Sequence, residues 1–394
     1  MAPVHDPLPI DEVEERIKLS SQIKGDLKTF RAIDVAILMT IPLENLREAA
    51  LSARQAIPFQ HIRHFVRMVL QRRLKEFSEG TSLPPGPRKR KVITTASKSS
   101  YISDSDDPSY TPEREKMTEK KSKNRDQIER SKCIDRDRSS CILLGTSSPE
   151  ACHIIPFAIN SNQRSLTEVF GQQGFHYLWS SADPILRHKL LTDHLGCSDK
   201  VWNMISLNRQ LHKWWAEPFF ALKCLGIIPA LGRGMNATIK LQFHWTPRRA
   251  QLQQTDPQGK GKGKDTDQHW ARPVNLYNGE ATNMVSDWKE RRCYGTPEIL
   301  SMGGIVSAAD AATGRILQTG RVVELRMPLQ DAEDMRAMVD LQWACVQIAS
   351  MSGAAGQDDF LEDPDDDYYE DLMAVWFEQQ QRCMTGERPP ASRG

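Results

Sequence analysis

No apolar run in this sequence approaches the roughly 20 residues that a helix needs to cross a bilayer. The first ten residues also lack the basic-then-apolar layout of a signal peptide. Only eight cysteines occur among 394 residues, and no two of them stand in a CxxC pair. We therefore expect a soluble, intracellular protein whose cysteines are mostly reduced and buried as small apolar side chains.

Charge is unevenly distributed along the chain, although the formal net charge is only +1. Lys and Arg gather before residue 140, whereas Asp and Glu gather after residue 357. The basic run 87–91, PRKRK, resembles a short nuclear import signal. We therefore include the nucleus among the expected locations and expect no membrane partner.

Helical periodicity marks the N-terminal region, residues 1–79. In its last segment, apolar residues recur at spacings of three and four, from Ile62 to Phe77. Basic residues lie off that apolar stripe: Arg63, Arg67, Arg72, Arg73 and Lys75. We expect this basic face to meet solvent, with contact to phosphates as the alternative.

Two polar segments and a tail divide the rest of the chain, which is long enough for about two domains. Residues 80–124 are too poor in apolar side chains to offset the entropy of ordering, so a disordered linker is predicted there. The Gly- and Lys-rich segment 246–272 is a predicted flexible linker, and 357–394 is an acidic tail. Two structured regions remain, 125–245 and 273–356.

These two regions read as a mixture of strands and helices. In the first, strands are predicted at 141–144, 151–155, 219–228 and 238–245, with a helical insertion at 166–196 and a helix carrying Leu207 and Leu211. In the second, a hairpin with arms at 315–317 and 322–327 precedes a strongly apolar helix at 332–354. The predicted fold class is therefore α+β.

Three short segments combine polar residues with a specific spacing. They read CILLG from Cys141, EACHIIP from Glu150, and NMISLNRQLH from Asn203 to His212. His153 precedes an apolar pair and a proline, and Asn203 and His212 stand nine positions apart. In these features the sequence resembles the HNH endonuclease family, in particular the fungal HNH-domain proteins. The resemblance implies a ββα-metal core, in which a hairpin delivers the first His and a helix carries the Asn and the second His.

The resemblance also implies a role for each residue. Hydrolysis of a phosphodiester needs a deprotonated water and a cation that offsets the developing negative charge. His153 is the expected general base, because an ordinary imidazole accepts a proton at neutral pH. Asn203 would brace the loop and orient His153, and His212 would bind the metal. The expected function is metal-dependent cleavage of nucleic acid, DNA before RNA.

Two positions depart from the family pattern. Cys152 precedes the expected base, where the family often has a metal-binding Asp or His, and Ala216 stands four residues after His212, where a further ligand is common. The remaining ligands would then be Cys152 and Glu217, or Glu150. One divalent ion is expected, zinc, manganese or magnesium, and a thiolate ligand would favour zinc. No structural zinc is expected, because Asn208 and Leu211 occupy the places of the helix-side cysteine pair in relatives.

The predicted helix also carries two basic residues and two tryptophans. Arg209 and Lys213 are candidate phosphate-binding groups. Trp214 and Trp215 are expected to pack in the core rather than stack on bases.

The pair Asp193-His194 imitates the Asp-His of many HNH sites. It lacks the apolar residues and the proline that follow His153. We therefore expect it to lie outside the site.

Two other functions remain open at this point. The chain could be a nucleic-acid-binding HNH module that has lost catalysis, as the departures at Cys152 and Ala216 suggest. It could also be an interaction scaffold in which the helices at 9–77 and 332–354 carry the role. The oligomeric state is left open.

Overall fold

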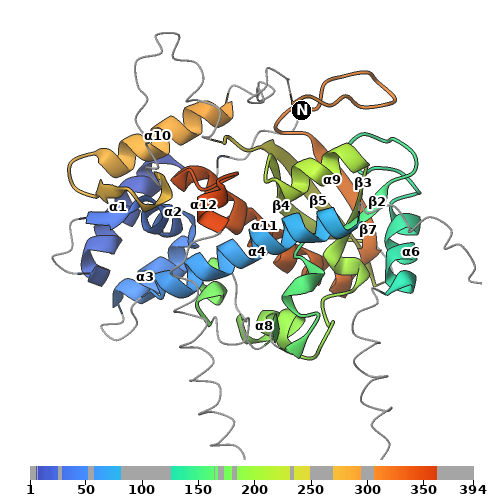
Figure 1. The fold of residues 1–394 in the computed structure, drawn as a ribbon, viewed down its shortest axis with the longest axis horizontal. Coiled ribbons are helices and arrows are strands. Elements are labelled where there is room, and N and C mark those ends of the chain that lie inside the picture. Colours follow the sequence, from blue (N-terminus) through green and yellow to red (C-terminus); the bar gives the residue numbers. More distant parts are fainter. Residues whose placement is uncertain are drawn as a thin grey trace, which may run out of the picture.

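The computed structural model describes residues 6, 8–24, 29–51, 57–80, 126–163, 165–166, 173–179, 184–230, 235–248, 269–293 and 306–361. Almost all of the predicted linker 80–124 lies outside the described residues, including the basic run 87–91. Most of 246–272 and of the acidic tail does so too. The described chain combines helices and strands in an α+β arrangement (Figure 1).

Helices dominate the N-terminal region, as its periodicity predicted. They are α1 (Ile10–Lys24), α2 (Ala32–Thr40), α3 (Leu43–Leu51) and α4 (Phe59–Gly80). A short strand, β1 (Thr29–Arg31), pairs antiparallel with β6 (Pro273–Asn275), and α10 (Glu280–Cys293) follows β6. The segment after the 246–272 linker is therefore bound to the N-terminal helices by backbone hydrogen bonds.

Only part of the basic face of α4 meets solvent: Lys75 is exposed as predicted, but the four arginines are buried or half-buried. The side chains of Arg67 and Arg73 are buried. Arg63 pairs with Asp34, and Arg72 donates a hydrogen bond to the carbonyl of Ala158. The apolar periodicity identified only the most apolar side of α4. It did not indicate that other elements of the fold also cover the basic side.

The central element is α11 (Leu329–Ser352), which confirms the helix predicted at 332–354. Every residue from Leu341 to Ser352 is buried, as expected for a helix enclosed on all sides. The helix ends where Gly353 adopts a left-handed conformation (φ 83°). It packs against α2 and α4 on one side and a three-stranded sheet on the other, so it joins the two halves of the chain (Figure 1).

The sheet that covers α11 has the strand order β4–β5–β7 and is antiparallel. Its strands are β4 (Phe220–Pro229), β5 (Asn236–Trp245) and β7 (Val322–Pro328). The predicted hairpin at 315–327 was wrong. Its second arm is β7, which pairs with β5, while residues 315–317 form only one isolated bridge, between Ile316 and Ala309.

A second, smaller unit holds the HNH-like residues. It consists of β2 (Glu150–His153) paired antiparallel with β3 (Met204–Leu207), followed directly by α9 (Arg209–Ala216). The strand predicted at 141–144 is instead a turn, closed by the Gly145 amide bonding to the Cys141 carbonyl at 2.8 Å. Leu207 belongs to β3, not to a helix as predicted. Asn203 lies in the short 3₁₀ helix η3 (Val201–Asn203), so Asn203 and His212 are not on one helix.

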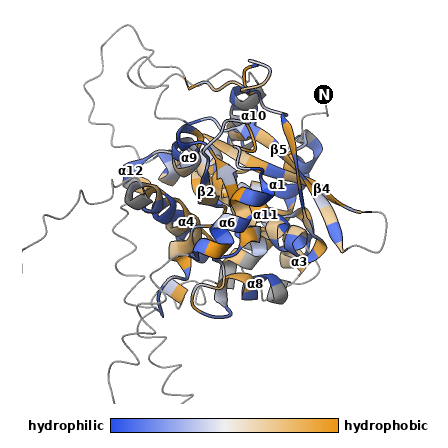
Figure 2. Cartoon of the chain, turned by 90° about the vertical axis from the view of Figure 1, so that its right-hand side faces the viewer, coloured by the Kyte–Doolittle hydropathy of each residue, from blue (hydrophilic) through white to orange (hydrophobic). Residues whose placement is uncertain are grey.

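The remaining helices contact this unit, α11 or the N-terminal helices. They are α6 (Gln127–Arg136), η1 (Phe157–Ile159), η2 (Gln173–Leu178), α8 (Pro184–Thr192), η5 (His269–Ala271) and α12 (Asp358–Leu361). α4 crosses the unit and contacts both η1 and α9 (Figure 1). One continuous cluster of buried apolar side chains extends from Leu8 to Phe360. Figure 2 marks the hydrophobic residues of the described elements in orange. In the described ranges, no helix has the length and apolar character to span a membrane.

The role of α11 predicts a large effect of one core substitution. Ile348→Ala removes a fully buried side chain and should lower the free energy of unfolding by about 2–5 kcal/mol. Ile316→Ala is the matched control, because Ile316 is 55% exposed, and it should change stability by less than about 0.5 kcal/mol. Chemical denaturation measures both. Equal effects of the two substitutions would contradict the central position of α11.

Candidate functional site

His153 is held between two carboxylates. It is the last residue of β2, and its ring is buried. Nδ1 lies 2.6 Å from Oε1 of Glu76, on α4, and Nε2 lies 2.9 Å from Oδ1 of Asp199, which lies shortly before η3. Phe157 stacks beside the ring, with centroids 5.9 Å apart. Both nitrogens of His153 are therefore engaged inside the protein.

This environment fixes the protonation state of His153. Burial alone lowers the pKa of an imidazole, but the charges and hydrogen bonds of Glu76 and Asp199 outweigh it and raise the pKa of His153 to about 9. At neutral pH the ring is an imidazolium that donates to both carboxylates. A protonated, enclosed imidazole has no lone pair for a water molecule, so this geometry does not support the predicted role of general base.

Asn203 braces the chain after His153. Its Oδ1 accepts a hydrogen bond from the amide of Ile155 at 2.9 Å, and its Nδ2 donates to the carbonyls of Ile155 at 2.8 Å and Ser198 at 3.0 Å. The side chain is completely buried, so these bonds satisfy both ends of the amide. Bracing of this loop matches the role that the resemblance implied. The side-chain hydrogen bonds of Asn203 are all to backbone groups, and none is to the ring of His153.

His212 forms a separate pair nearer the surface. Its Nδ1 lies 2.7 Å from Oε2 of Glu150, the first residue of β2. The ring also meets Phe77 of α4 edge-on, with centroids 5.1 Å apart. Among the described residues, no group bonds to Nε2 of His212. This atom is also not fully buried, and the side chain is 15% exposed. Nε2 of His212 therefore faces solvent, oriented by the carboxylate at the other nitrogen.

Cations surround the His212–Glu150 pair. The hydrogen bond from His212 lowers the pKa of Glu150, and the charges of Arg209 and Arg130 lower it further. Arg209 is exposed in the first turn of α9, and Arg130 lies on α6. Lys213 is exposed one residue after His212, 3.9 Å from Glu217. The pair is thus a carboxylate-oriented imidazole with basic residues beside it.

The predicted metal ligands do not come together. Cys152 is buried, burial raises the pKa of its thiol well above the usual value, and its Sγ donates to the Glu150 carbonyl. Glu217 contacts Lys213 and not His212. In the part of the chain that the structure describes, no three His, Cys, Asp or Glu side chains converge as a metal site would require. These residues do not fit a divalent ion held by several protein ligands.

The other sequence candidates fall into two groups. Trp214 and Trp215 are buried, and Trp215 donates to the carbonyl of His153, so both serve the core as expected. Asp193 and His194 are both exposed and pair with each other, with 2.8 Å between Oδ2 of Asp193 and Nδ1 of His194. Neither forms a hydrogen bond with His153 or His212 among the described residues.

Sequence reasoning missed the residues that decide the state of His153. Glu76 is 77 positions away, inside a helix whose pattern indicated only an apolar stripe and a basic face. Asp199 stands four residues before Asn203, and that proximity was the only available signal. Asp199 is also tied to α6, because its Oδ2 accepts the amide of Asp126 at 2.6 Å.

Comparison with known proteins points to the same segment. Residues 141–223 match a protein family described as HNH endonuclease, about a fifth of the 394-residue chain. This segment contains β2, β3 and α9, and the match supports the HNH family for it. No curated protein and no solved structure matches the chain.

The state of His153 predicts how stability depends on pH. The folded pKa of about 9 lies above the ordinary 6.5, so the stabilisation is complete below pH 6.5 and is lost as pH rises through 9. At about 1.4 kcal/mol per pKa unit, the loss is on the order of 3 kcal/mol. Urea denaturation at pH 6.5 and pH 9.5 measures it.

Two variants control this measurement. His153→Ala leaves two carboxylates facing each other, and should cost about 3–5 kcal/mol at pH 7 and remove this part of the pH dependence. His194→Ala alters an exposed histidine and should leave both the stability and its pH dependence unchanged. A wild-type curve that runs parallel to that of His153→Ala would show that His153 is not an imidazolium at neutral pH.

Proposed function

We propose that the chain binds nucleic acid through its HNH segment, at the surface that carries His212, Glu150, Arg209 and Lys213. In this proposal β2, β3 and α9 form the ββα unit, and the segment has exchanged the buried His153 base for a structural ion pair. The observation that carries the proposal is the contrast between the two histidines. His153 is enclosed by carboxylates, whereas His212 presents Nε2 to solvent.

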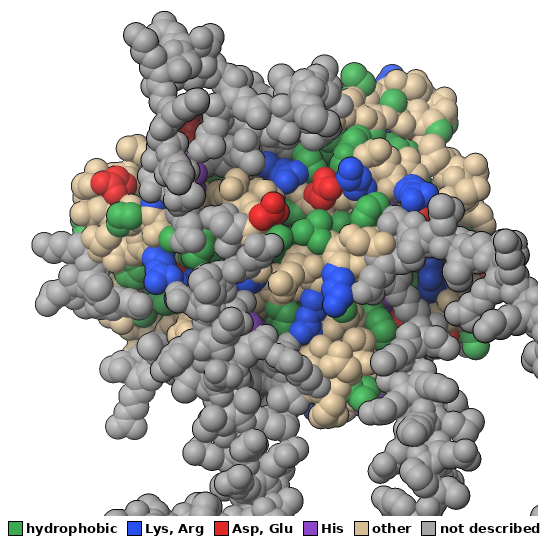
Figure 3. Space-filling view, in the orientation of Figure 1, with side chains coloured by type: hydrophobic (Ala, Val, Ile, Leu, Met, Phe, Trp, Pro, Cys, Tyr) green, Lys and Arg blue, Asp and Glu red, His purple; other side chains and the backbone are tan. Residues whose placement is uncertain are grey.

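Electrostatics supports a phosphate ligand at this surface. Arg209 and Lys213 are exposed, and Arg130 adds a third cation near Glu150. Guanidinium and ammonium groups attract phosphates regardless of base sequence, which suits a binding mode without a groove-reading helix. Figure 3 shows Lys and Arg side chains distributed over the described part of one face, with Asp and Glu between them. DNA is the first ligand to test, and RNA the second.

A cleaving enzyme is the second candidate, and one observation favours it. Glu150 holds Nδ1 of His212, which leaves Nε2 able to take a proton from a water beside a bound phosphodiester. Arg209 and Lys213 would then offset the charge on the phosphate oxygens. Because the described residues do not assemble a metal site, we assign no step to a metal ion.

Binding should respond to the two exposed cations. Replacing both Arg209 and Lys213 by Ala should weaken binding of duplex DNA on the order of tenfold. The slope of log affinity against log salt should become shallower by about 0.9 for each cation removed. Lys18→Ala removes an exposed cation from α1 and is the control. Fluorescence anisotropy at several salt concentrations measures both, and identical slopes for the wild type and the double variant would refute this binding surface.

Cleavage separates the two candidates. A plasmid-nicking assay, run with chelator and with added magnesium, manganese or zinc, should show no cutting if the chain only binds. If it cuts, His212→Ala should reduce the rate by about 10²–10⁴, the usual contribution of a general base. Cutting that survives in His212→Ala would exclude His212 as the acting group.

A further inference from the structure

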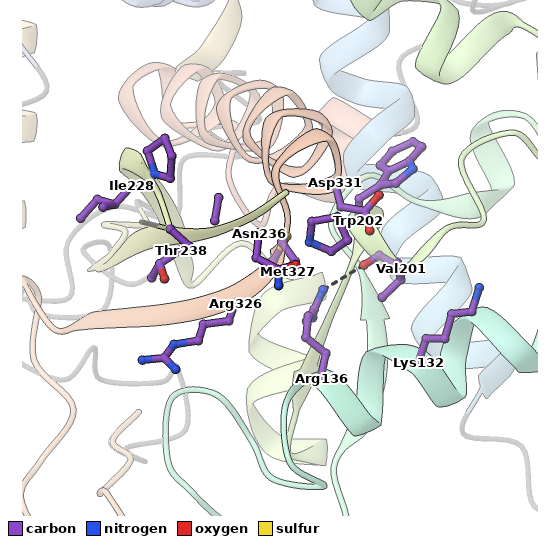
Figure 4. A pocket seen from close by; sticks show the side chains of 14 residues that line it. Lys132, Arg136, Val201, Trp202, Ile228, Asn236, Thr238, Arg326, Met327 and Asp331 are labelled. Carbon is purple, nitrogen blue, oxygen red and sulfur yellow. Dashed lines mark hydrogen bonds between the residues drawn. The ribbon is translucent and has the colours of Figure 1, made fainter. Parts of the chain in front are cut away.

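A second site lies beside α6. An open cavity of about 830 Å³ is bounded by α6, η3, the start of α11 and one end of the β4–β5–β7 sheet. Figure 4 shows Ile228, Thr238 and Arg326 on one side and Lys132, Trp202 and Asp331 on the other. Its volume is in the range of cavities that hold small organic ligands. The HNH match covers only Val201 and Trp202 of its lining, and the proposed function does not include the cavity.

The strand side of the cavity is a row of neighbouring residues. Ile228 pairs with Thr238, and Thr238 pairs with Arg326, so their side chains stand next to one another on one face of the sheet. Ile228 is 51% exposed, so its side chain is accessible to a ligand in the cavity. The row therefore offers a ligand an apolar surface with a cation at its end.

Two charged side chains of the cavity, Arg326 and Asp331, make no ion pair or side-chain hydrogen bond with the described residues. Lys132 already binds Glu129, and the guanidinium of Arg136 already binds Asp137. Arg326, by contrast, makes no ion pair or side-chain hydrogen bond with any described residue. Asp331 accepts no hydrogen bond from the described chain. Burial and the charge of Glu129 raise the pKa of its carboxyl, and the charges of Arg136 and Lys132 partly offset that rise. A ligand that completes the cavity needs an anionic group, an apolar body and a hydrogen-bond donor.

We propose that this cavity binds a single nucleotide, with the phosphate at Arg326 and the base between Trp202 and Ile228. The exocyclic amine of adenine, cytosine or guanine would donate to Asp331. A nucleotide is favoured over a smaller zwitterion by the volume and by the apolar row. It is also favoured by Lys132 and Arg136 of α6, which add two cations to the lining of the cavity. The inference does not depend on cleavage or binding at His212.

Calorimetry on the full chain tests the inference, with the four nucleoside monophosphates as ligands. Those with an exocyclic amine should bind more tightly than uridine monophosphate. Arg326→Ala should weaken binding at least tenfold, and Arg326→Lys should restore part of it. Arg315→Ala is the matched control, because Arg315 is exposed and outside the cavity, and it should bind like the wild type. Asp331→Ala should abolish the preference over uridine monophosphate, with a thermal melt confirming that each variant is folded.

A second set of ligands distinguishes the sources of the nucleotide. A 5′-phosphorylated trinucleotide that binds more tightly than the monophosphates, and still depends on Arg326, would indicate a strand entering the cavity. Arg326→Ala should weaken monophosphate binding by the same factor in the Arg209→Ala background as in the wild type, so this inference and the proposed function can fail separately. The inference is overturned if no nucleotide binds at millimolar concentration, if Arg326→Ala binds like Arg315→Ala, or if inorganic phosphate or glutamate binds as tightly.

Discussion

The buried ion pair of His153 with Glu76 and Asp199 ties together elements that are far apart in sequence. Glu76 comes from the N-terminal helix α4, His153 from β2, and Asp199 from the segment before η3. Two carboxylates can be buried here only if a cation lies between them, because desolvation of unpaired charges is costly. The imidazolium therefore holds α4 in place over the HNH segment. Arg73 reinforces the contact by donating to the Ile154 carbonyl and lying over the Trp215 ring.

This arrangement changes what an HNH-like motif can do. The His-Asn-His spacing suggests a nuclease. In this structure it places His153 in an enclosed position and His212 nearer the surface. Asn203 keeps its bracing role, since its bonds are to the backbone of the loop and need no ligand. His212 keeps an oriented ring, because Glu150 is its neighbour across β2 and α9. His212, rather than His153, therefore has a ring nitrogen without a protein partner among the described residues, and the proposed function rests on it.

The long helices and most strands were predictable because each has a strong local pattern. The helix at 332–354 and the strands at 219–228 and 238–245 match α11, β4 and β5 to within a few residues. The errors were at short segments. Residues 141–144 are apolar enough for a strand, but the turn at Gly145 closes on them, and β2 pairs with β3 from 50 residues further on. Pairing partners depend on the whole chain, which local pattern does not report.

The sequence by itself determined which side chains stand at the spacing of an HNH segment and which long elements the chain forms, because both depend on order and periodicity along the chain. Tertiary structure alone decided the state of each group. Glu76 reaches His153 only because α4 folds across β2, and the pKa of about 9 follows from that contact. The partial exposure of His212 and the burial of Arg67 and Arg73 were decided in the same way. Desolvation and Coulomb interactions act through space, so residues distant in sequence set the protonation and accessibility on which function depends.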